Sequence, residues 1–374
     1  MTNIIAEIGT SHSGSYQKAV RLVDAACDAG ADTIKFQWVY ADEILHPKTG
    51  FVALPTGNIP LYERFRQLEC PPQFYKDILD YVHSKGRKFC CSPFGLRSLR
   101  ELLDLDVDFV KIASPELNHI KMLECLRAFR DSQAESGRSR VPVILSSGVS
   151  KLSDIDLALE IVGRENVSLL HCVTSYPAPE DEYNLRLVST LRAVLGIETG
   201  VSDHSLDPVL VPVLSAACGG TVIEKHFTLS RETDGLDDPV ALEPEQFALM
   251  VHAVRQSETA VRHYGMEEGM RRIIDQLSEQ FGRERVSTVL GDGIKRLAPA
   301  ESANYGRTNR SLHFMRDMRK GETITGDDIG ILRTEKILTP GIHPRFFDEI
   351  VGARLSSDVE AGQGVRLGDV IQRI

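Results

Sequence analysis

The sequence has no long apolar run, no closely spaced cysteine pair of the CxxC type and no surplus of basic residues. No apolar run approaches the roughly 20 residues that a membrane-spanning helix needs. The seven cysteines are an odd number, and without paired spacing they do not indicate a disulfide framework. Because 53 acidic residues outnumber 43 basic ones and give a net charge of −10, neither nucleic acid nor an anionic membrane is expected as a partner.

The N-terminus leaves little room for a targeting segment. Strand-like residues begin at Ile4, whereas a signal peptide needs a longer apolar stretch after a basic start. Cys27, Cys125 and Cys218 fall within apolar helical stretches and are expected to be reduced core residues. We therefore expect a cytoplasmic protein.

Strand-like and helix-like segments alternate eight times before Tyr264. Eight such units favour a closed (β/α)8 barrel, also called a TIM barrel. An open doubly wound sheet is the alternative, but the first strand-to-helix turn lacks the GxGxxG fingerprint. Between residues 38 and 71 we expect only a long loop. The predicted strands cover residues 4–8, 33–37, 88–92, 108–114, 142–147, 167–173, 199–204 and 221–227.

The pattern changes after Tyr264. Residues 266–286 are charged and helix-prone, and a polar connector with glycine and proline follows. We expect a barrel with a helical extension over residues 1–286, a linker over 287–308 and a small β-rich domain over 309–374. Within the last domain, Asp317 to Ile324 is loosely echoed by Asp358 to Val365, which suggests two similar halves. A domain this small with little apolar bulk is expected to depend on a neighbouring surface for stability.

The eighth predicted strand ends in charged residues. Glu224 and His226 lie on one face of the predicted strand, and Lys225 lies on the other face. Buried charges are costly unless they are paired or bound to a ligand. The seventh strand also ends in a histidine, His204, and two neighbouring strands of this kind could hold one metal ion. A hydrogen-bonded core histidine is the alternative at each position.

In a (β/α)8 barrel the carboxyl ends of the strands face one mouth, where polar residues are typically functional. Lysines with surrounding hydroxyl groups suit a phosphate-bearing anion, and the carboxylates Glu7 and Glu116 could move protons. The alternatives are that the lysines pair with Glu7 or Glu224 and that the serines cap helices. Besides these carboxylates, the residues at this mouth are Lys35, Gln37, Ser92, Lys111, Ser114, Ser146, Ser147, Ser175, Tyr176, Ser202, His204 and His226.

Nine short motifs follow one another along the chain. They are Ile5-Ala6-Glu7-Ile8-Gly9, Ile34-Lys35-Phe36-Gln37, Ser92-Pro93-Phe94, Lys111-Ile112-Ala113-Ser114, Ile144-Leu145-Ser146-Ser147-Gly148, Leu170-His171-Cys172, Tyr176-Pro177, Ser202-Asp203-His204 and Glu224-Lys225-His226-Phe227-Thr228. In this order they resemble the sialic acid (N-acylneuraminate, or nonulosonate) synthase family. The last domain, with Asn309-Arg310-Ser311-Leu312 and Lys320-Gly321-Glu322, resembles that family's antifreeze-like SAF domain, a β-clip fold.

The resemblance implies condensation of phosphoenolpyruvate with an N-acetylated aldose such as N-acetylmannosamine, which gives a nine-carbon 2-keto acid and phosphate. It implies that His204 and His226 bind Mn2+ or Mg2+, which polarises the sugar aldehyde. Catalytic roles fall to Glu7, Lys111 and Glu116, with Glu116 assisting sugar-ring opening or proton transfer. The residues implied to hold phosphoenolpyruvate are Lys35, Ser92, Lys111, Ser114, Ser147 and Ser202.

The resemblance also implies contacts to the sugar. Gln37, Tyr176 and Asp237 are expected to touch it within the barrel. Arg333 of the SAF domain is expected to reach the sugar site of the other subunit in a domain-swapped homodimer.

Four features depart from the family pattern. They are Ser13 and Thr174, each in place of an asparagine, the loop Asp234-Gly235-Leu236-Asp237-Asp238, and the apparent insertion over residues 266–286. Two other functions stay open. One is a Schiff-base aldolase with Lys111 or Lys225 as nucleophile, and the other is a noncatalytic sugar-binding protein.

Overall fold

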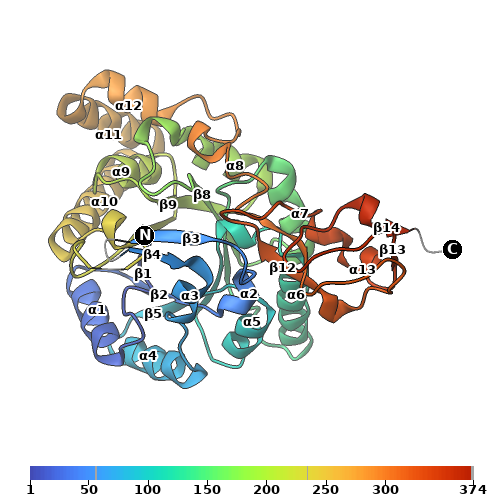
Figure 1. The fold of residues 1–374 in the computed structure, drawn as a ribbon. Coiled ribbons are helices and arrows are strands. Elements are labelled where there is room, and N and C mark those ends of the chain that lie inside the picture. The colour runs from blue at the N-terminus through green and yellow to red at the C-terminus, as the bar shows by residue number, and fades with distance from the viewer. Residues whose placement is uncertain (55–56, 234, 372–374) are drawn as a thin grey trace.

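The computed structural model describes residues 1–54, 57–233 and 235–371. Eight parallel strands form a closed barrel, in which β1 pairs with both β2 and β10 (Figure 1). This closure confirms the (β/α)8 prediction and excludes the open sheet. The barrel strands are β1 (Asn3–Gly9), β2 (Thr33–Trp38), β5 (Lys88–Pro93), β6 (Phe109–Ile112), β7 (Val143–Ser146), β8 (Val167–Cys172), β9 (Glu198–Asp203) and β10 (Val222–His226).

Helices cover the outside of the barrel, and the main core lies between them and the strands (Figure 1). Local sequence sets their starts, as where Ser15 caps α1 by accepting a hydrogen bond from the Lys18 backbone N–H at 3.2 Å. No helix in the described part of the chain is long and apolar enough to cross a bilayer. The helices are α1 (Tyr16–Asp28), α4 (Pro72–Ser84), α5 (Leu96–Leu103), α6 (Ile120–Glu135), α7 (Leu152–Val162), α8 (Arg186–Leu195), α9 (Leu210–Ala217) and α10 (Pro244–Tyr264).

The segment between β2 and α4 is not the plain loop that the sequence suggests. It contains α2 (Ala41–Ile44), the antiparallel strands β3 (Phe51–Leu54) and β4 (Gly57–Pro60), and α3 (Leu61–Arg66). The prediction was wrong because these elements have only four to six residues each, too few to show a helical or strand period.

The helical extension consists of α11 (Met266–Phe281) and α12 (Arg283–Leu290), beside α9 and α10 (Figure 1). Helix α12 therefore continues past residue 287, where the linker was expected to begin. Arg285 pairs with Glu180 at 2.7 Å and with Asp207 at 3.4 Å. These carboxylates lie in the loops after β8 and β9, so the extension supports two loops at the barrel mouth.

The C-terminal domain contains β11 (Arg310–Phe314), β12 (Ile329–Arg333), α13 (Phe347–Ile350), β13 (Arg354–Leu355) and β14 (Val370–Ile371). Its two halves match each other, as the sequence echo predicts. Asp317 accepts the Ala361 N–H and Asp358 accepts the Lys320 N–H, both at 2.8 Å. The domain has a small separate core and packs on the barrel.

Candidate active site

Side chains that point into the barrel form two layers. The lower layer is apolar and consists of Ile5, Cys90, Ile144, Leu170 and Val222. Because strand side chains alternate between faces, the residues two positions further on also point inward. They are Glu7, Ser92, Ser146, Cys172 and Glu224, and all of them line a cavity of about 190 Å³ above the apolar layer.

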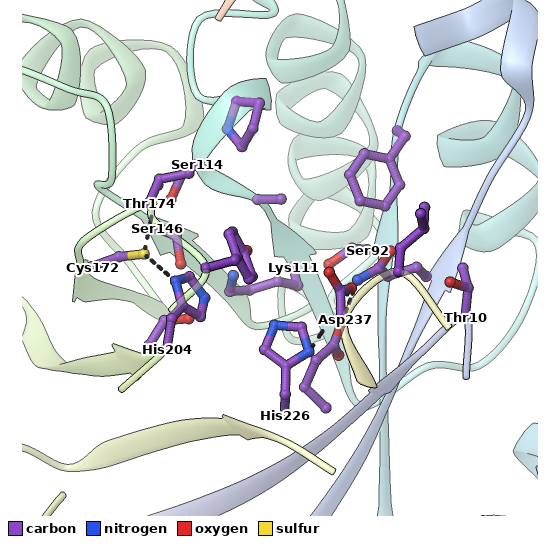
Figure 2. A pocket seen from close by; sticks show the side chains of 18 of the residues that line it. Thr10, Ser92, Lys111, Ser114, Ser146, Cys172, Thr174, His204, His226 and Asp237 are labelled. Atoms are coloured by element: carbon purple, nitrogen blue, oxygen red, sulfur yellow. Dashed lines mark hydrogen bonds and ion pairs between the residues drawn. The ribbon is translucent and has the colours of Figure 1, made fainter. Parts of the chain in front are cut away.

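The cavity receives residues from all eight barrel strands or the loops that follow them. Thr308 from the linker and Arg333 from β12 close it from the side of the C-terminal domain. Figure 2 shows Lys111 among the labelled side chains of the cavity, together with the two histidines and with Ser92, Ser114 and Ser146. The residues predicted from the sequence that line the cavity are Glu7, Lys35, Gln37, Ser92, Lys111, Ser114, Ser146, Tyr176, Ser202, His204, Glu224, His226, Asp237 and Arg333.

The two lysines share one carboxylate. Glu224 lies 3.7 Å from Lys35 and 3.4 Å from Lys111, and it accepts a hydrogen bond from Ser202 at 3.0 Å. Glu7 pairs with Lys35 at 2.5 Å. Lys35 and Lys111 therefore pair with carboxylates, which was the alternative to binding an anion. Both lysines also line the cavity.

The charged neighbours give the two carboxylates pKa values that shift in opposite directions. Burial raises the pKa of Glu7, and nearby Glu224 adds to this effect although Lys35 opposes it. Burial also acts to raise the pKa of Glu224, but Lys111 and Lys35 outweigh it and lower the pKa. Glu224 is thus the fixed anion, and Glu7 is the carboxyl group suited to carry a proton.

Two hydroxyl groups at the cavity lack partners. Ser92 Oγ and Ser146 Oγ are buried without a hydrogen bond to any described group. An unsatisfied buried polar group costs about 1–3 kcal/mol. An anionic ligand beside the lysines would accept hydrogen bonds from both hydroxyls.

The two strand-end histidines lie together, as predicted, with ring centroids 5.4 Å apart. Tyr176 stacks on His204 at 4.3 Å. Val173 O lies 2.9 Å from His204 Nδ1, which leaves Nε2 available to a ligand. Burial lowers the pKa of His226 well below its ordinary value, so this imidazole is neutral.

The Cys172 thiol lies 3.8 Å from His204 Nδ1. Burial lowers the pKa of His204, but Cys172, the Val173 carbonyl and Asp203 together outweigh this effect, and the pKa rises to about 9. A cation at His204 would have to displace this proton. No third carboxylate, cysteine or histidine joins the pair to form a ligand group among the residues described. Two imidazoles fit a divalent ion that takes its other ligands from water and substrate.

The structure does not bring Ser147 to the cavity. Its hydroxyl donates to Leu170 O at 3.2 Å, while Ser146 takes the inward position. The reason is the strand alternation, which turns Ser146 inward with Ile144 and turns its neighbour away.

Glu116 also lies outside the cavity lining. Its Oε1 accepts hydrogen bonds from Arg310 at 2.9 Å and from Arg333 at 2.7 Å. This buried carboxylate therefore holds the C-terminal domain on the barrel and orients Arg333. The arrangement does not favour the ring-opening role that the resemblance implies for Glu116.

Lys225 and Arg333 also differ from expectation. Lys225 faces away from the cavity and pairs with Asp203 at 2.6 Å, with both side chains buried, so it cannot act as a Schiff-base nucleophile there. Arg333 lines the cavity of its own chain, whereas the resemblance implies that it reaches another subunit.

The departures from the family pattern are spread around the mouth. Thr174 lines the cavity, and Ser13 lies in the loop after β1. Asp238 is buried and accepts hydrogen bonds from Ser11 and Thr233, which fixes the loop that carries Asp237. Asp234 lies outside the described residues.

The family model for NeuB matches residues 22–265, and the model for the SAF domain matches residues 309–371. The chain belongs to the NeuB family. This confirms the resemblance that the nine motifs carry.

Sequence relatives of this NeuB-family chain include proteins named as synthases. The N,N'-diacetyllegionaminic acid synthase of Legionella pneumophila is 30% identical over 370 residues, which cover 96% of this chain and 92% of the relative. The pseudaminic acid synthase of Campylobacter jejuni is 29% identical over 376 residues, covering 98% of this chain and 96% of the relative. The chain therefore belongs to a family of enzymes.

A solved relative supports the fold. The spore coat polysaccharide biosynthesis protein SpsE of Bacillus subtilis has a TM-score of 0.81 and 28% identity, and the match covers 100% of this chain and 96% of that one. The match thus includes the barrel and the C-terminal domain.

Sequence reasoning missed several residues that line the cavity. Phe65 and Leu68 lie within the segment for which the sequence predicts only a loop, and Thr308 lies at the end of the linker. No periodic pattern marks them. Phe94 could have been found, because it follows Ser92 in a motif at the end of a strand.

Proposed function

We propose that this NeuB-family chain condenses phosphoenolpyruvate with an N-acetylated aldose, such as N-acetylmannosamine, to a nine-carbon 2-keto acid and phosphate. The observation that carries this proposal is the convergence of Lys35 and Lys111 on a cavity whose Ser92 and Ser146 hydroxyls lack partners. Two ammonium groups and free hydroxyl donors match a small molecule that bears both a phosphate and a carboxylate.

The proposed reaction forms one C–C bond and replaces the C2–O bond to phosphate with a C2–O bond to the oxygen of water. C3 of phosphoenolpyruvate attacks the aldehyde carbon of the open-chain sugar, water adds at C2, and phosphate then leaves with its bridging oxygen. Lys35 and Lys111 hold the anion, and Glu7 either delivers a proton to the aldehyde oxygen or accepts one from the water that adds at C2. A divalent cation, Mn2+ or Mg2+, held by His204 and His226 would polarise the aldehyde.

The charges of the cavity support a neutral acceptor sugar. Its lysines are paired with Glu7 and Glu224, and Arg333 is paired with Glu116 at 2.7 Å. Among the described residues that line the cavity, no other lysine or arginine is available for a second phosphate. We therefore propose that the acceptor is not phosphorylated.

The proposal includes a homodimer in the cytoplasm. All seven cysteines are free thiols, which suits a reducing compartment. Exchange of the C-terminal domains between two copies would preserve the contacts of Arg310 and Arg333 with Glu116, now between chains. A mixture of two variants with defects in different domains distinguishes contacts within one chain from exchanged contacts.

Release of phosphate from phosphoenolpyruvate tests the proposed function. The purified protein is assayed with a panel of N-acetylated aldoses, each with and without a 6-phosphate, and with Mn2+, Mg2+ or EDTA. We expect release with at least one unphosphorylated sugar and loss of activity in EDTA. No release with any sugar, together with borohydride trapping of pyruvate on Lys111, would instead indicate a Schiff-base aldolase.

A further inference from the structure

The chain between α12 and β11, residues 291–309, forms a strap against the loop that follows β7. Lys295 Nζ donates to Ser147 O at 3.2 Å, and Asn309 Nδ2 donates to Val149 O at 3.1 Å. Tyr305 also donates to Asp154 at the start of α7, at 3.0 Å. The strap thus does more than connect two domains, because it fixes the backbone beside the cavity.

Glu301 is the buried carboxylate of this strap, with 1% of its surface exposed. Its Oε1 accepts hydrogen bonds from the backbone N–H groups of Val149 and Thr174, both at 2.7 Å. Its Oε2 accepts from Ala298 N–H at 3.2 Å, within the strap. One carboxylate oxygen therefore joins the loop after β7 to the loop after β8.

The loop after β7 needs such support because its backbone is strained. Val149 has a φ of +42°, a left-handed conformation that a β-branched residue rarely adopts. Its side chain is fully buried. Glu301 holds its N–H and Asn309 holds its C=O, so the strap holds both sides of the strained residue.

The held backbone is in contact with the cavity lining. Thr174 lines the cavity directly, and Gly148 N–H donates to the hydroxyl of Ser114, another lining residue, at 3.0 Å. Gly148 is closely packed against these two residues, because a Cβ added to it would lie 1.9 Å from Thr174 Oγ1 and 2.8 Å from Ser114 Oγ. A shift of this backbone would therefore displace Ser114 and Thr174.

We propose that Glu301 is a positioning residue, which sets the anion-binding side of the cavity through the backbones of Val149 and Thr174. The inference rests on the proposed function, since it assigns Ser114 and its neighbours to phosphoenolpyruvate. Glu301 touches no substrate in this arrangement. Its effect is on the placement of groups that do, and such misplacement commonly costs up to about 100-fold in rate.

Steady-state kinetics of three full-length variants test the proposal. Glu301→Ala removes the acceptor, and we expect the KM for phosphoenolpyruvate to rise roughly 10-fold to 100-fold while the KM for the sugar changes little. Glu301→Gln keeps an oxygen for both N–H groups and should restore most of the loss. Glu182→Ala is the matched control, because Glu182 anchors the same strap at Ala300 N–H, at 2.8 Å, without contacting the loop after β7.

Three results would overturn the proposal. They are an unchanged KM for phosphoenolpyruvate in Glu301→Ala, an equal rise in Glu182→Ala, and no rescue by Glu301→Gln. If Glu301→Ala does not fold, Asn309→Ala releases the other side of Val149 and should raise the same KM by a smaller factor; no rise there would count against the proposal.

Amide hydrogen exchange separates this inference from the proposed function. If Glu301 fixes the loops, exchange at Val149 and Thr174 should be at least about tenfold faster in Glu301→Ala than in the wild type, whether or not the wild type releases phosphate. Unchanged exchange at both amides would refute the positioning role. Absence of phosphate release from the wild type, with faster exchange in the variant, would refute only the assigned reaction.

Discussion

Ser13 has a backbone conformation that does not suit a serine residue. It is exposed and has a φ of +51°, a left-handed conformation that favours glycine or asparagine. We expect Ser13→Asn and Ser13→Gly to raise the free energy of unfolding by up to about 1 kcal/mol. Ser13→Ala is the matched control and should give no gain, because alanine is strained in the same way. Urea unfolding measures all three, and equal midpoints would contradict the assignment of strain.

Lys111 is the residue whose substitution best separates the two substrates. It lies at the cavity and 3.4 Å from Glu224. Charge-assisted hydrogen bonds are worth about 1.5–3 kcal/mol, so we expect Lys111→Met to lower kcat/KM for phosphoenolpyruvate by roughly 10-fold to 100-fold. The same kinetics should show a smaller change for the sugar. A change confined to the KM of the sugar would show that Lys111 binds the sugar and would contradict its assignment to phosphoenolpyruvate.

For single residues, the sequence predicts which residue types lie at the barrel mouth better than it predicts which way their side chains point. Glu7, Ser92 and Glu224 follow inward-facing apolar residues by two positions, so alternation alone brings them to the cavity. The choice between Ser146 and Ser147 depended on the phase of β7, which requires knowing that Ile144 faces inward. The partners of Glu116 come from the C-terminal domain, nearly 200 positions away at Arg310, and no local pattern shows such a contact.

The C-terminal domain is the element on which closure of the cavity depends. Deletion of residues 309–374 removes Arg310 and Arg333 from Glu116 and opens one side of the cavity. The barrel core lies within the remaining chain. We expect the truncated chain to keep its helical circular dichroism and to lose phosphate release by about 100-fold or more. Substantial activity would show that the domain does not complete the site.

A mixture of two impaired variants tests which chain supplies that domain. Arg333→Ala and Lys111→Met place the defects in different domains. Because Arg333 lines the cavity of its own chain, we expect no recovery of activity after confirmed subunit exchange. Recovery to about one quarter of the wild-type activity would show a domain-swapped dimer.

The elements themselves differ in how far sequence could predict them. The barrel strands were predicted within about two residues at their ends, because an apolar period and glycine or proline stops mark them. The strands β3 and β4 and the short helices around them were not. Elements of four to six residues depend on contacts with the rest of the chain rather than on their own pattern.

The stability of the whole molecule should depend on pH through its buried histidines. Burial lowers the pKa of His12 to about 4, of His119 to about 3 and of His313 to about 4, from an ordinary value of 6.5. Below pH 6.5 the unfolded chain binds these protons and the folded chain does not. Each such histidine then lowers the free energy of unfolding by up to about 1.4 kcal/mol per pH unit.

Urea unfolding between pH 7.5 and pH 5 measures this dependence. We expect the midpoint to fall steadily below about pH 6.5. His119 caps α6 by accepting the Met122 N–H at 3.3 Å, and Asn is a good residue for the same cap. His119→Asn should therefore reduce the slope with pH. A midpoint that is constant down to pH 5 would contradict the burial of neutral histidines.

The fate of one oxygen atom tests the central proposal most directly. The protein is given Mn2+, an N-acetylated aldose and phosphoenolpyruvate with 18O at the bridging C2 oxygen, and both products are examined by mass spectrometry. The account predicts that the 18O appears in inorganic phosphate and that the keto acid has the mass of the sugar plus a pyruvate unit without label. Label retained in the keto acid, or no such keto acid, would contradict it.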